Sequence, residues 1–309
     1  MARLLPNGFY VFYFHDISDN PDVPANVRTS PERFIREISY IHSNFDIVRL
    51  ADGIAMLDQQ WASGVDGRYA AISFDDGFRS IWTTAYPALT QRKLPATLFI
   101  NGAALDGETW LEAVLMHNLA RYRDVDWMNE TFPHLRSAES LSAFVRQNSG
   151  PQFAARLMEL RPPELLKKQL YLDRDDLDRM SPDLVNIANH SFSHYWLAHL
   201  PIDVQRIDID RGHHCLRDLP HYVPLLALPY GSDDSFNDDT VSIVERDWNG
   251  ILIKAVGGIA HSREGGHLSI ERIGLNDNKP PIELHVRDRV LGESFGNRVR
   301  SRLRAVVRR

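Results

Sequence analysis

Two short segments of this sequence bring together acidic and imidazole side chains of the kind that bind metals or move protons. Residues 73–77 read Ser-Phe-Asp-Asp-Gly and directly follow an apolar run typical of a buried strand. Adjacent carboxylates at a strand tip repel each other, so they coexist only beside a cation or with a bound proton. Residues 190–194 read His-Ser-Phe-Ser-His, again after a strand-like run. Two imidazoles four residues apart share one face of a helical turn, and both can then reach a single ion.

The two segments together predict a metal centre with an unligated carboxylate beside it. Asp76, His190 and His194 supply the two imidazoles and one carboxylate of a hydrolytic metal site with an open position. A catalytic zinc lowers the pKa of water to about 7. The remaining carboxylate, Asp75, is then free to accept the proton of that water. Each segment alone has a plainer interpretation, because Asp-Gly is an ordinary turn signal and a single histidine is more often hydrogen-bonded than metal-bound.

A third segment, residues 226–231 (Leu-Ala-Leu-Pro-Tyr-Gly), ends another apolar run. Proline followed by tyrosine and glycine makes a rigid turn, which could present a backbone N–H group and an aromatic face to a ligand. By itself this segment indicates a turn and no more.

The elements that must position these segments alternate between strands and helices. Seven short apolar runs are typical of strands, at 9–14, 47–49, 69–74, 96–101, 185–188, 225–228 and 251–255. Helical periodicity is found at 31–44, 78–90 and 238–248. This alternation predicts an α/β fold with a parallel sheet, and about seven such units favour a closed or nearly closed (β/α) barrel. In such a barrel the chemistry lies at the C-terminal ends of the strands, which is where the three segments fall.

One internal stretch and one terminus depart from this alternation. From 106 to 180 the pattern is helical without a good strand, which predicts a helical insertion into a barrel that spans 1–290. The insertion is expected to pack beside the mouth of the barrel, where it could narrow the site or form a contact between two copies of the chain. The Arg-rich tail 291–309 is predicted to be either a solvated helix or a basic amphipathic helix that adsorbs to anionic lipid.

Composition excludes several classes of protein. Lys and Arg number 35 against 41 Asp and Glu, and the net charge of -6 argues against nucleic acid as the main partner. The single cysteine, Cys215, excludes an intrachain disulfide framework and a cysteine-rich zinc module. The N-terminal residues do not resemble a signal peptide, and no apolar run approaches the ~18 residues of a membrane span. We therefore expect a cytoplasmic protein.

The three segments also occur in a familiar order. Asp-Asp-Gly after a strand, then His-Ser-x-x-His, then Pro-Tyr-Gly resembles the polysaccharide deacetylase family, also known as carbohydrate esterase family 4 or the NodB-homology domain. The Ala-x-Pro-Tyr-Gly form at 227–231 is similar to one branch of that family. Residues 13–16 (Tyr-Phe-His-Asp), 94–100 and 181–189 also resemble the family. The likeness leaves the insertion and the tail unmatched.

This resemblance implies a distorted (β/α) barrel that removes acyl groups from N-acylated sugars. It implies Asp75 as the general base and the backbone N–H of Tyr230 as a donor to the oxyanion. It also implies zinc, or alternatively cobalt, nickel or manganese, as the ion held by the three ligands named above. The turn residues Pro229 and Gly231 are then assigned to substrate binding.

The sequence departs from the family pattern at two points. Ala227 stands where the family usually has an arginine that orients the base, and Arg272 is the best candidate to replace it. The closing Leu-x-His, which supplies a general acid, has no clear match, because Leu284-His285 falls in a predicted late helix. The donor to the leaving amine is thus unassigned. His15, at the end of the first strand, is a candidate both for this role and for substrate binding.

The predicted function is a metal-dependent hydrolase that removes an acetyl or formyl group from the nitrogen of a sugar or sugar conjugate. In the cytoplasm its substrate would be a sugar nucleotide, a lipid-linked sugar at the inner membrane face, or a small metabolite. The basic tail fits the lipid-linked form. Two alternatives stay open: an amidase of a non-sugar substrate such as a cyclic ureide, and a carbohydrate-binding relative without catalysis. The intact carboxylates and imidazoles favour catalysis, since a binding module needs no base beside a metal.

Overall fold

The computed structural model describes residues 5–60, 65–105, 110–137, 140–165, 168–259, 262–264 and 267–290. Its main sheet consists of β1 (Gly8–Phe14), β4 (Asp46–Ile47), β5 (Arg68–Phe74), β6 (Ala96–Ile100), β7 (Val185–Asn189), β8 (Tyr222–Leu226) and β12 (Ile273–Gly274). Six strands lie in the order β12-β1-β5-β6-β7-β8, and β4 pairs with the first half of β5. All of these pairs are parallel. The predicted α/β fold with a parallel sheet of about seven strands is confirmed.

The register of the sheet brings the chemical segments to one edge. β1 and β5 pair in register up to Phe14 opposite Phe74. His15 and Asp75 therefore follow these strands side by side, and the backbone N–H of Asp75 donates to the carbonyl of Phe14. β6 and β7 also end together, so His190 follows at the same edge. The apolar runs that predict these strands are buried on both faces, as expected for a parallel sheet covered by helices.

A second sheet completes the barrel. It consists of β9 (Ile251–Ile253), β10 (Ser262–Glu264) and β11 (His267–Ile270), in the order β10-β11-β9. An isolated parallel bridge between Ala227 and Ile253 joins the end of β8 to β9. The chain after β11 runs directly into β12, which pairs with β1. The barrel is thus nearly closed but irregular. A further short parallel pair is formed by β2 (Asp16–Ile17) and β3 (Arg28–Thr29).

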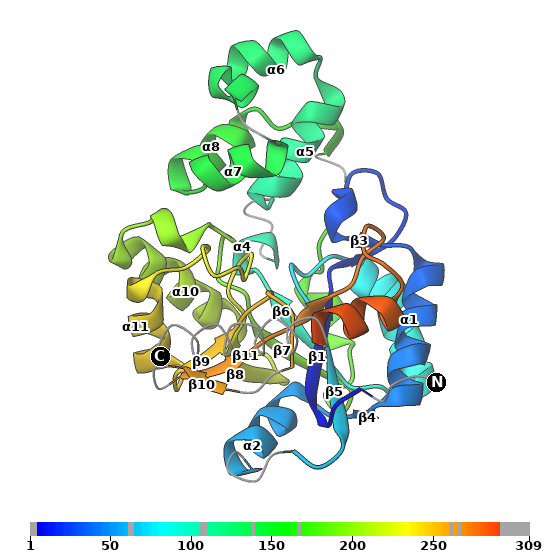
Figure 1. The fold of residues 1–309 in the computed structure, drawn as a ribbon. Helices are drawn as coiled ribbons and strands as arrows, with labels where there is room; N and C mark the ends of the chain where they lie inside the picture. Colours follow the sequence, from blue (N-terminus) through cyan, green and yellow to red (C-terminus); the bar gives the residue numbers. More distant parts are fainter. Residues whose placement is uncertain are drawn as a thin grey trace, which may run out of the picture.

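Helices surround the strands, and Figure 1 shows four of them outside the sheet. These four are α1 (Pro31–Asn44), α2 (Leu50–Gln60), α10 (Ile202–Leu216) and α11 (Asp238–Asp247). The short helices α3 (Tyr86–Arg92), α4 (Gly102–Leu105) and α9 (Arg174–Asp178) and a helical segment at 282–290 complete the set around the barrel. Each long helix buries an apolar face; in α1 that face includes Phe34, Ile38 and Ile41.

The helical insertion forms a lobe at one end of the molecule (Figure 1). The lobe contains α5 (Glu112–Tyr122), α6 (Val125–Thr131), α7 (Leu141–Asn148) and α8 (Pro151–Glu159). It has its own apolar core, which includes Leu115, Leu119, Phe132 and Phe144. Among the described residues from 110 to 180, the only strand-like pairing is the isolated bridge of Tyr171 with Phe78. The predicted helical character of this stretch is therefore correct.

Several sequence-based boundaries are wrong for physical reasons. The strand expected at 225–228 is β8 at 222–226, because the register between β7 and β8 shifts between Ile187 and Asn189. The helix expected at 78–90 begins with a π-helical turn, Ile81–Ala85, and continues as α3. It starts late because residues 76 and 77 take left-handed conformations as the chain leaves the strand tip. The sequence analysis also missed α2 and α10.

No helix among the described residues is both long enough and apolar enough to span a bilayer. The Arg-rich tail 291–309, for which a helix is predicted, lies outside the described residues.

Candidate metal centre

Three predicted ligands converge at the carboxyl end of the barrel strands. The Oδ1 atom of Asp76 lies 3.6 Å from Nε2 of His190 and 3.4 Å from Nε2 of His194. All three ligand atoms lie within 4.8 Å of one another, and all three residues are buried. Such separations suit atoms that share one ion with bonds of about 2.0–2.2 Å. Within the described part of the chain, no other group of His, Cys, Asp and Glu side chains meets this criterion.

The two histidines reach the site from a loop. The expectation of a helical turn at 190–194 is wrong, since these residues have no helical structure. Instead, Ser191 and His194 adopt left-handed conformations with φ of 64° and 60°. Asp76 and Tyr230 do the same, with φ of 69° and 60°. A left-handed backbone is uncommon for residues other than glycine, and such strain is typical of functional sites held by surrounding structure.

Hydrogen bonds fix the orientation of this loop. Nδ1 of His190 lies 2.9 Å from the carbonyl oxygen of Ala227, which leaves Nε2 to face the ligand group. The backbone N–H of His194 donates to Oγ of Ser191. The backbone N–H of Ser193 donates to the buried carboxylate of Asp208 on α10. The imidazole positions are therefore set by the backbone and by α10 before any ion binds.

The electrostatics of the three ligands fit a divalent cation. Asp76 Oδ1 is buried and has no hydrogen-bond partner among the described residues. Burial raises the pKa of Asp76 well above its usual range, and the neighbouring carboxylate of Asp75 raises it further. Burial lowers the pKa of His190 and lowers that of His194 well below its usual range. A cation would satisfy the unpartnered oxygen and would bind the two neutral imidazoles. The donor set suits zinc, cobalt, nickel or manganese.

Asp75 is held beside this group by Arg272, the residue that sequence analysis proposed for that role. The guanidinium forms a two-pronged ion pair with the carboxylate, with Nη1–Oδ1 and Nη2–Oδ2 distances of 2.7 and 2.8 Å. Arg272 is fully buried, and its Nε donates to the carbonyl of Lys254. Burial alone would raise the pKa of Asp75, but the charge of Arg272, with a smaller contribution from His190, lowers it to about 2. Asp75 is therefore ionised at neutral pH.

His15 lies at the same strand edge and lines the same cavity. Its ring packs against Tyr13 with 5.4 Å between ring centroids. Burial lowers the pKa of His15 to about 4, although the charge of Asp75 partly offsets this effect. The imidazole is consequently neutral at pH 7.

The Pro-Tyr-Gly turn packs against the second ligand histidine. The ring of Tyr230 packs against that of His194 at 4.6 Å and against that of Trp196 at 4.8 Å. Pro229 accepts a hydrogen bond from the N–H of Gly231, which closes the turn. The backbone N–H of Tyr230 has no acceptor among the described residues. Its role as a donor to a ligand stays a prediction.

A cavity of about 640 Å³ joins these groups to the helical lobe. Its floor holds the ligand triad, Asp75, His15 and Tyr230. Its walls include residues that sequence analysis did not identify: Tyr13, Asn26, Leu111, Val114, Val145, Asn276 and Lys279. The apolar members come from the insertion, which contains none of the three segments, and only its helical period could have indicated that they face one way. His285, in the unmatched closing segment, is buried and is not among the residues that line this cavity.

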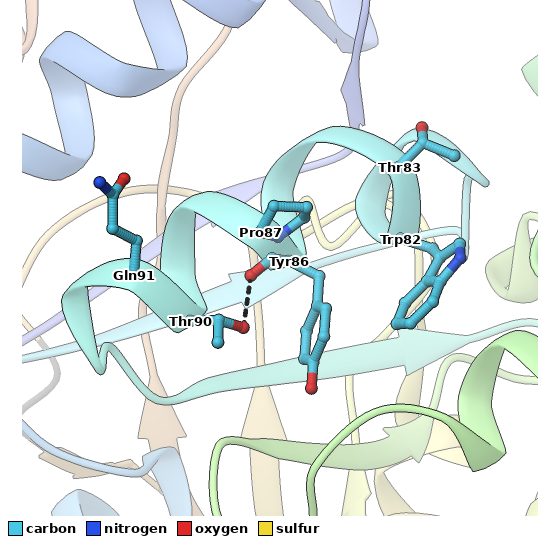
Figure 2. Close-up of a pocket in the computed structure, with 6 residues that line it drawn as sticks. All are labelled: Trp82, Thr83, Tyr86, Pro87, Thr90 and Gln91. Atoms are coloured by element: carbon cyan, nitrogen blue, oxygen red, sulfur yellow. Dashed lines mark hydrogen bonds between the residues drawn. The ribbon is translucent and has the colours of Figure 1, made fainter.

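A second hollow lies on the outer face of the helix that follows β5 (Figure 2). It is lined by Trp82, Thr83, Tyr86, Pro87, Thr90 and Gln91. The rings of Trp82 and Tyr86 stack at 5.1 Å, and the hydroxyl of Tyr86 accepts a hydrogen bond from the backbone N–H of Ser181. This hollow is lined by no carboxylate or imidazole, so the hydrolytic chemistry belongs to the cavity that holds the ligand triad.

Close packing of α10 against the histidine loop leads to a testable expectation. A Cβ atom added at Gly212 would lie 2.7 Å from the backbone carbonyl carbon of Ser191. We expect Gly212→Ala to destabilise the protein by about 1–3 kcal/mol and to weaken metal binding, because the loop must shift. Urea unfolding and a metal titration would measure both effects. Ile207→Ala, at an exposed position of the same helix, is the matched control. Wild-type stability and affinity in Gly212→Ala would contradict this account.

A buried carboxylate links the helical lobe to the same loop. Glu112 at the start of α5 accepts hydrogen bonds from Oγ of Ser149 and from the N–H of Gly150. Oγ of Ser149 in turn accepts from the backbone N–H of Trp196, two residues beyond the second ligand histidine. Burial raises the pKa of Glu112 from 4.5 to about 7. The lobe and the loop are thus joined through a group that titrates near neutrality.

This raised pKa predicts a pH dependence of stability. Between pH 4.5 and about 7 the folded protein binds more protons at Glu112 than the unfolded chain does. The contribution of this residue to the free energy of unfolding therefore falls as pH rises, by up to about 3 kcal/mol. As pH rises from 5 to 8, we expect the free energy of unfolding of Glu112→Gln to fall less than that of the wild type. Urea unfolding across this range measures the difference, and parallel curves for the two proteins would refute it.

Comparison with known proteins identifies the class to which this fold and site belong. The chain belongs to the polysaccharide deacetylase family, since the family model described as "Polysaccharide deacetylase" matches residues 62–247. No curated protein matches the chain. The resemblance predicted from the three segments is therefore confirmed at the level of the family.

Solved structures share the fold over nearly the whole described chain. The Streptococcus pyogenes deacetylase PplD, in complex with acetate, is 16% identical; the match covers 90% of this chain and 97% of that one, with a TM-score of 0.60. IcaB from Ammonifex degensii is 15% identical, with coverage of 92% and 98% and a TM-score of 0.61. A de-N-acetylase from Aggregatibacter actinomycetemcomitans is 14% identical, with coverage of 89% and 97% and a TM-score of 0.55. At these identities the likeness establishes the fold alone.

Proposed function

We propose that the protein is a metal-dependent hydrolase that removes an acetyl or formyl group from the nitrogen of a sugar or sugar conjugate. The observation that carries this proposal is that one cavity holds both a ligand set for a metal ion and, beside it, a carboxylate that is not a ligand. Asp76, His190 and His194 offer a ligand set with no other partner for Asp76 Oδ1. Asp75, beside them, is held ionised by Arg272 and is not one of the three ligands, so its carboxylate is free to accept a proton.

The chain's own residues divide the work of amide hydrolysis. When bound, a divalent ion would polarise the acyl carbonyl and lower the pKa of a water molecule. Asp75 accepts the proton of the attacking water, because it is the carboxylate that the ligand triad leaves free. Arg272 keeps that carboxylate in one orientation through its two-pronged contact. The attack places negative charge on the acyl oxygen.

Two further residues act after the attack. The backbone N–H of Tyr230 donates to the developing oxyanion, a contribution of about 2.7–4 kcal/mol for one such donor in other enzymes. The leaving nitrogen needs a proton, and His15 is our candidate to deliver it. Its neutral ring lines the cavity beside Asp75, where it can receive the proton that Asp75 removes from water and pass it on.

A substrate screen tests the proposed function. The purified protein, supplied in turn with zinc, cobalt, nickel and manganese, is incubated with N-acetyl and N-formyl sugars and with their phosphate-linked forms. Release of acetate or formate is measured, and a free-amine assay on the same samples measures the second product. Asp75→Asn serves as the matched inactive control. Release by the wild type alone supports the proposal, whereas release from none of these substrates would contradict it.

The native metal, a contact between copies of the chain, a cytoplasmic location and a lipid contact of the tail all stay predictions. The buried Asp75–Arg272 pair beside the ligand group favours catalysis over the carbohydrate-binding alternative, because a site that only binds sugar gains nothing from burying two charged side chains.

A further inference from the structure

The catalytic cavity extends beyond the ligand group to two walls of different chemistry. One wall is aliphatic: Ala113 and Leu141 of the helical lobe and Pro24, Ala25 and Val27 of the loop are at least partly exposed, whereas Leu111, Val114 and Val145 line the cavity but are almost fully buried. The other wall is polar, with Asn26, Asn276, Asn278 and Lys279. A ligand that fills this space must therefore present both an apolar and a polar portion.

Lys279 is the single lysine or arginine among the described residues that line the cavity. Its ammonium group has no carboxylate within ion-pair distance in the part of the chain that the structure describes. Lys254, by contrast, forms two ion pairs, with its ammonium group 3.1 Å from Asp233 and 3.0 Å from Glu271. The charge of Lys279 is thus not used to balance a described acidic side chain.

The backbone that carries Lys279 is fixed by a short network. The side-chain amide of Asn276 donates to the carbonyl of Asn26 at 2.7 Å, and its oxygen accepts from the N–H of Asn278 at 3.0 Å. The N–H of Lys279 donates to the carbonyl of Asn276 at 3.0 Å. Asn276 is itself buried. The lysine therefore projects from an ordered loop that joins the polar wall to the segment 24–27.

The two aspartates of the cavity do not need this lysine for charge balance. Asp75 is paired with Arg272, and Asp76 belongs to the ligand group that a divalent ion would neutralise. A cation placed among asparagine side chains, which are neutral donors, suits an anionic group of several acceptor oxygens. Phosphate has this chemistry. The exposed part of the aliphatic wall gains free energy by contact with hydrocarbon, at about 25 cal/mol per Å² buried.

We propose that the substrate is an N-acylated sugar that carries a phosphate bound by Lys279 and a hydrocarbon chain that lies along the aliphatic wall of the lobe. This inference rests on the proposed function, since it names the substrate class of the same site. The phosphate itself could belong to a sugar phosphate, a sugar nucleotide or a lipid-linked sugar. The aliphatic wall assigns it to the last of these.

Kinetics with a matched substrate series test the phosphate contact. The series is one N-acyl sugar in four forms: unmodified, as its 1-phosphate, as its nucleotide diphosphate and as a short prenyl phosphodiester. We expect Lys279→Met to raise KM for every phosphate-bearing form by about tenfold or more, with kcat nearly unchanged. KM for the unmodified sugar should stay at the wild-type value. Lys279→Arg, which keeps the charge, should restore most of the affinity.

A second pair of variants tests the aliphatic wall. Ala113→Ser and Leu141→Asn place a polar group on this wall at positions that are only partly buried. Both should raise KM for the prenyl form alone, which should also be the form with the lowest wild-type KM. A lower wild-type KM for the nucleotide form, or equal effects of these variants on all forms, would overturn the lipid assignment.

The outcomes separate this inference from the function on which it rests. If the wild type hydrolyses all four forms and Lys279→Met changes none of the KM values, the phosphate site is refuted and the hydrolase stands. If no form is hydrolysed, the proposed function fails. Calorimetric binding of the N-deacylated prenyl phosphate sugar then still tests the subsite without turnover. Equal affinity of the wild type and Lys279→Met for that product would refute the phosphate site as well.

Discussion

Replacing Asp75 by asparagine is expected to lower kcat by about 10²- to 10⁴-fold while the protein keeps its metal. The amide has the shape of the carboxylate and can still accept a hydrogen bond from Arg272, but it cannot take a proton from water. Because Asp75 is not one of the three ligands, the ion should remain bound. The measurement is acyl release under saturating substrate, with metal content determined on the same preparation.

The adjacent residue provides the matched control for this variant. Asp76→Asn changes the same functional group one position along the chain, but at a ligand. It should lose both metal and activity, whereas Asp75→Asn should lose activity alone. If Asp75→Asn retains full activity, Asp75 is not the base. If it loses the metal, the division of roles between the two carboxylates is wrong.

Replacing Arg272 by methionine is expected to destabilise the protein by about 3–5 kcal/mol. The reason is that the carboxylate of Asp75 would stay buried without its guanidinium partner. In the wild type, Asp75 has a pKa of about 2, below its usual 3.8, so it contributes stability that is present above pH 3.8 and is lost as pH falls toward 2. Without Arg272, burial dominates and the pKa rises, so the stability of the variant should decrease as pH increases.

Urea unfolding of the wild type and of Arg272→Met at several pH values measures this effect. The double variant Asp75→Asn/Arg272→Met removes the unpaired charge and should recover much of the lost stability. An alternative explanation, a simple loss of packing against Tyr13 and Phe99, predicts no recovery in the double variant and no change in pH dependence. Wild-type stability of Arg272→Met would contradict the role given to the ion pair.

The sequence contained enough information to place the chemistry at the strand tips. Apolar runs that end in Asp-Asp-Gly, His-Ser-x-x-His and Pro-Tyr-Gly predict parallel strands with polar residues just beyond them, and the register of β1 with β5 and of β6 with β7 brings these residues together. The departure at Ala227 also pointed to Arg272, because the arginine that orients the base in the resembled family is missing there. The structure places that guanidinium on Asp75.

Other features depend on contacts that local patterns do not contain. The loop conformation at 190–194 is set by long-range hydrogen bonds to Ala227 and to Asp208 on α10, so the local expectation of a helical turn fails. The late start of the helix after β5 follows from the left-handed backbone at Asp76, which is a property of the assembled site. The polar wall with Lys279 combines segments about 250 residues apart in sequence, as Asn276 and Asn26 show.

The claim on which the whole account depends is that Asp76, His190 and His194 hold one divalent ion. The direct measurement is elemental analysis combined with a calorimetric zinc titration of the metal-stripped protein, carried out in parallel on His194→Ala and Asp75→Asn. The account predicts close to one tightly bound ion per chain in the wild type and in Asp75→Asn, and a loss of tight binding in His194→Ala. Equal metal binding by the wild type and His194→Ala, or none in the active wild type, would contradict it.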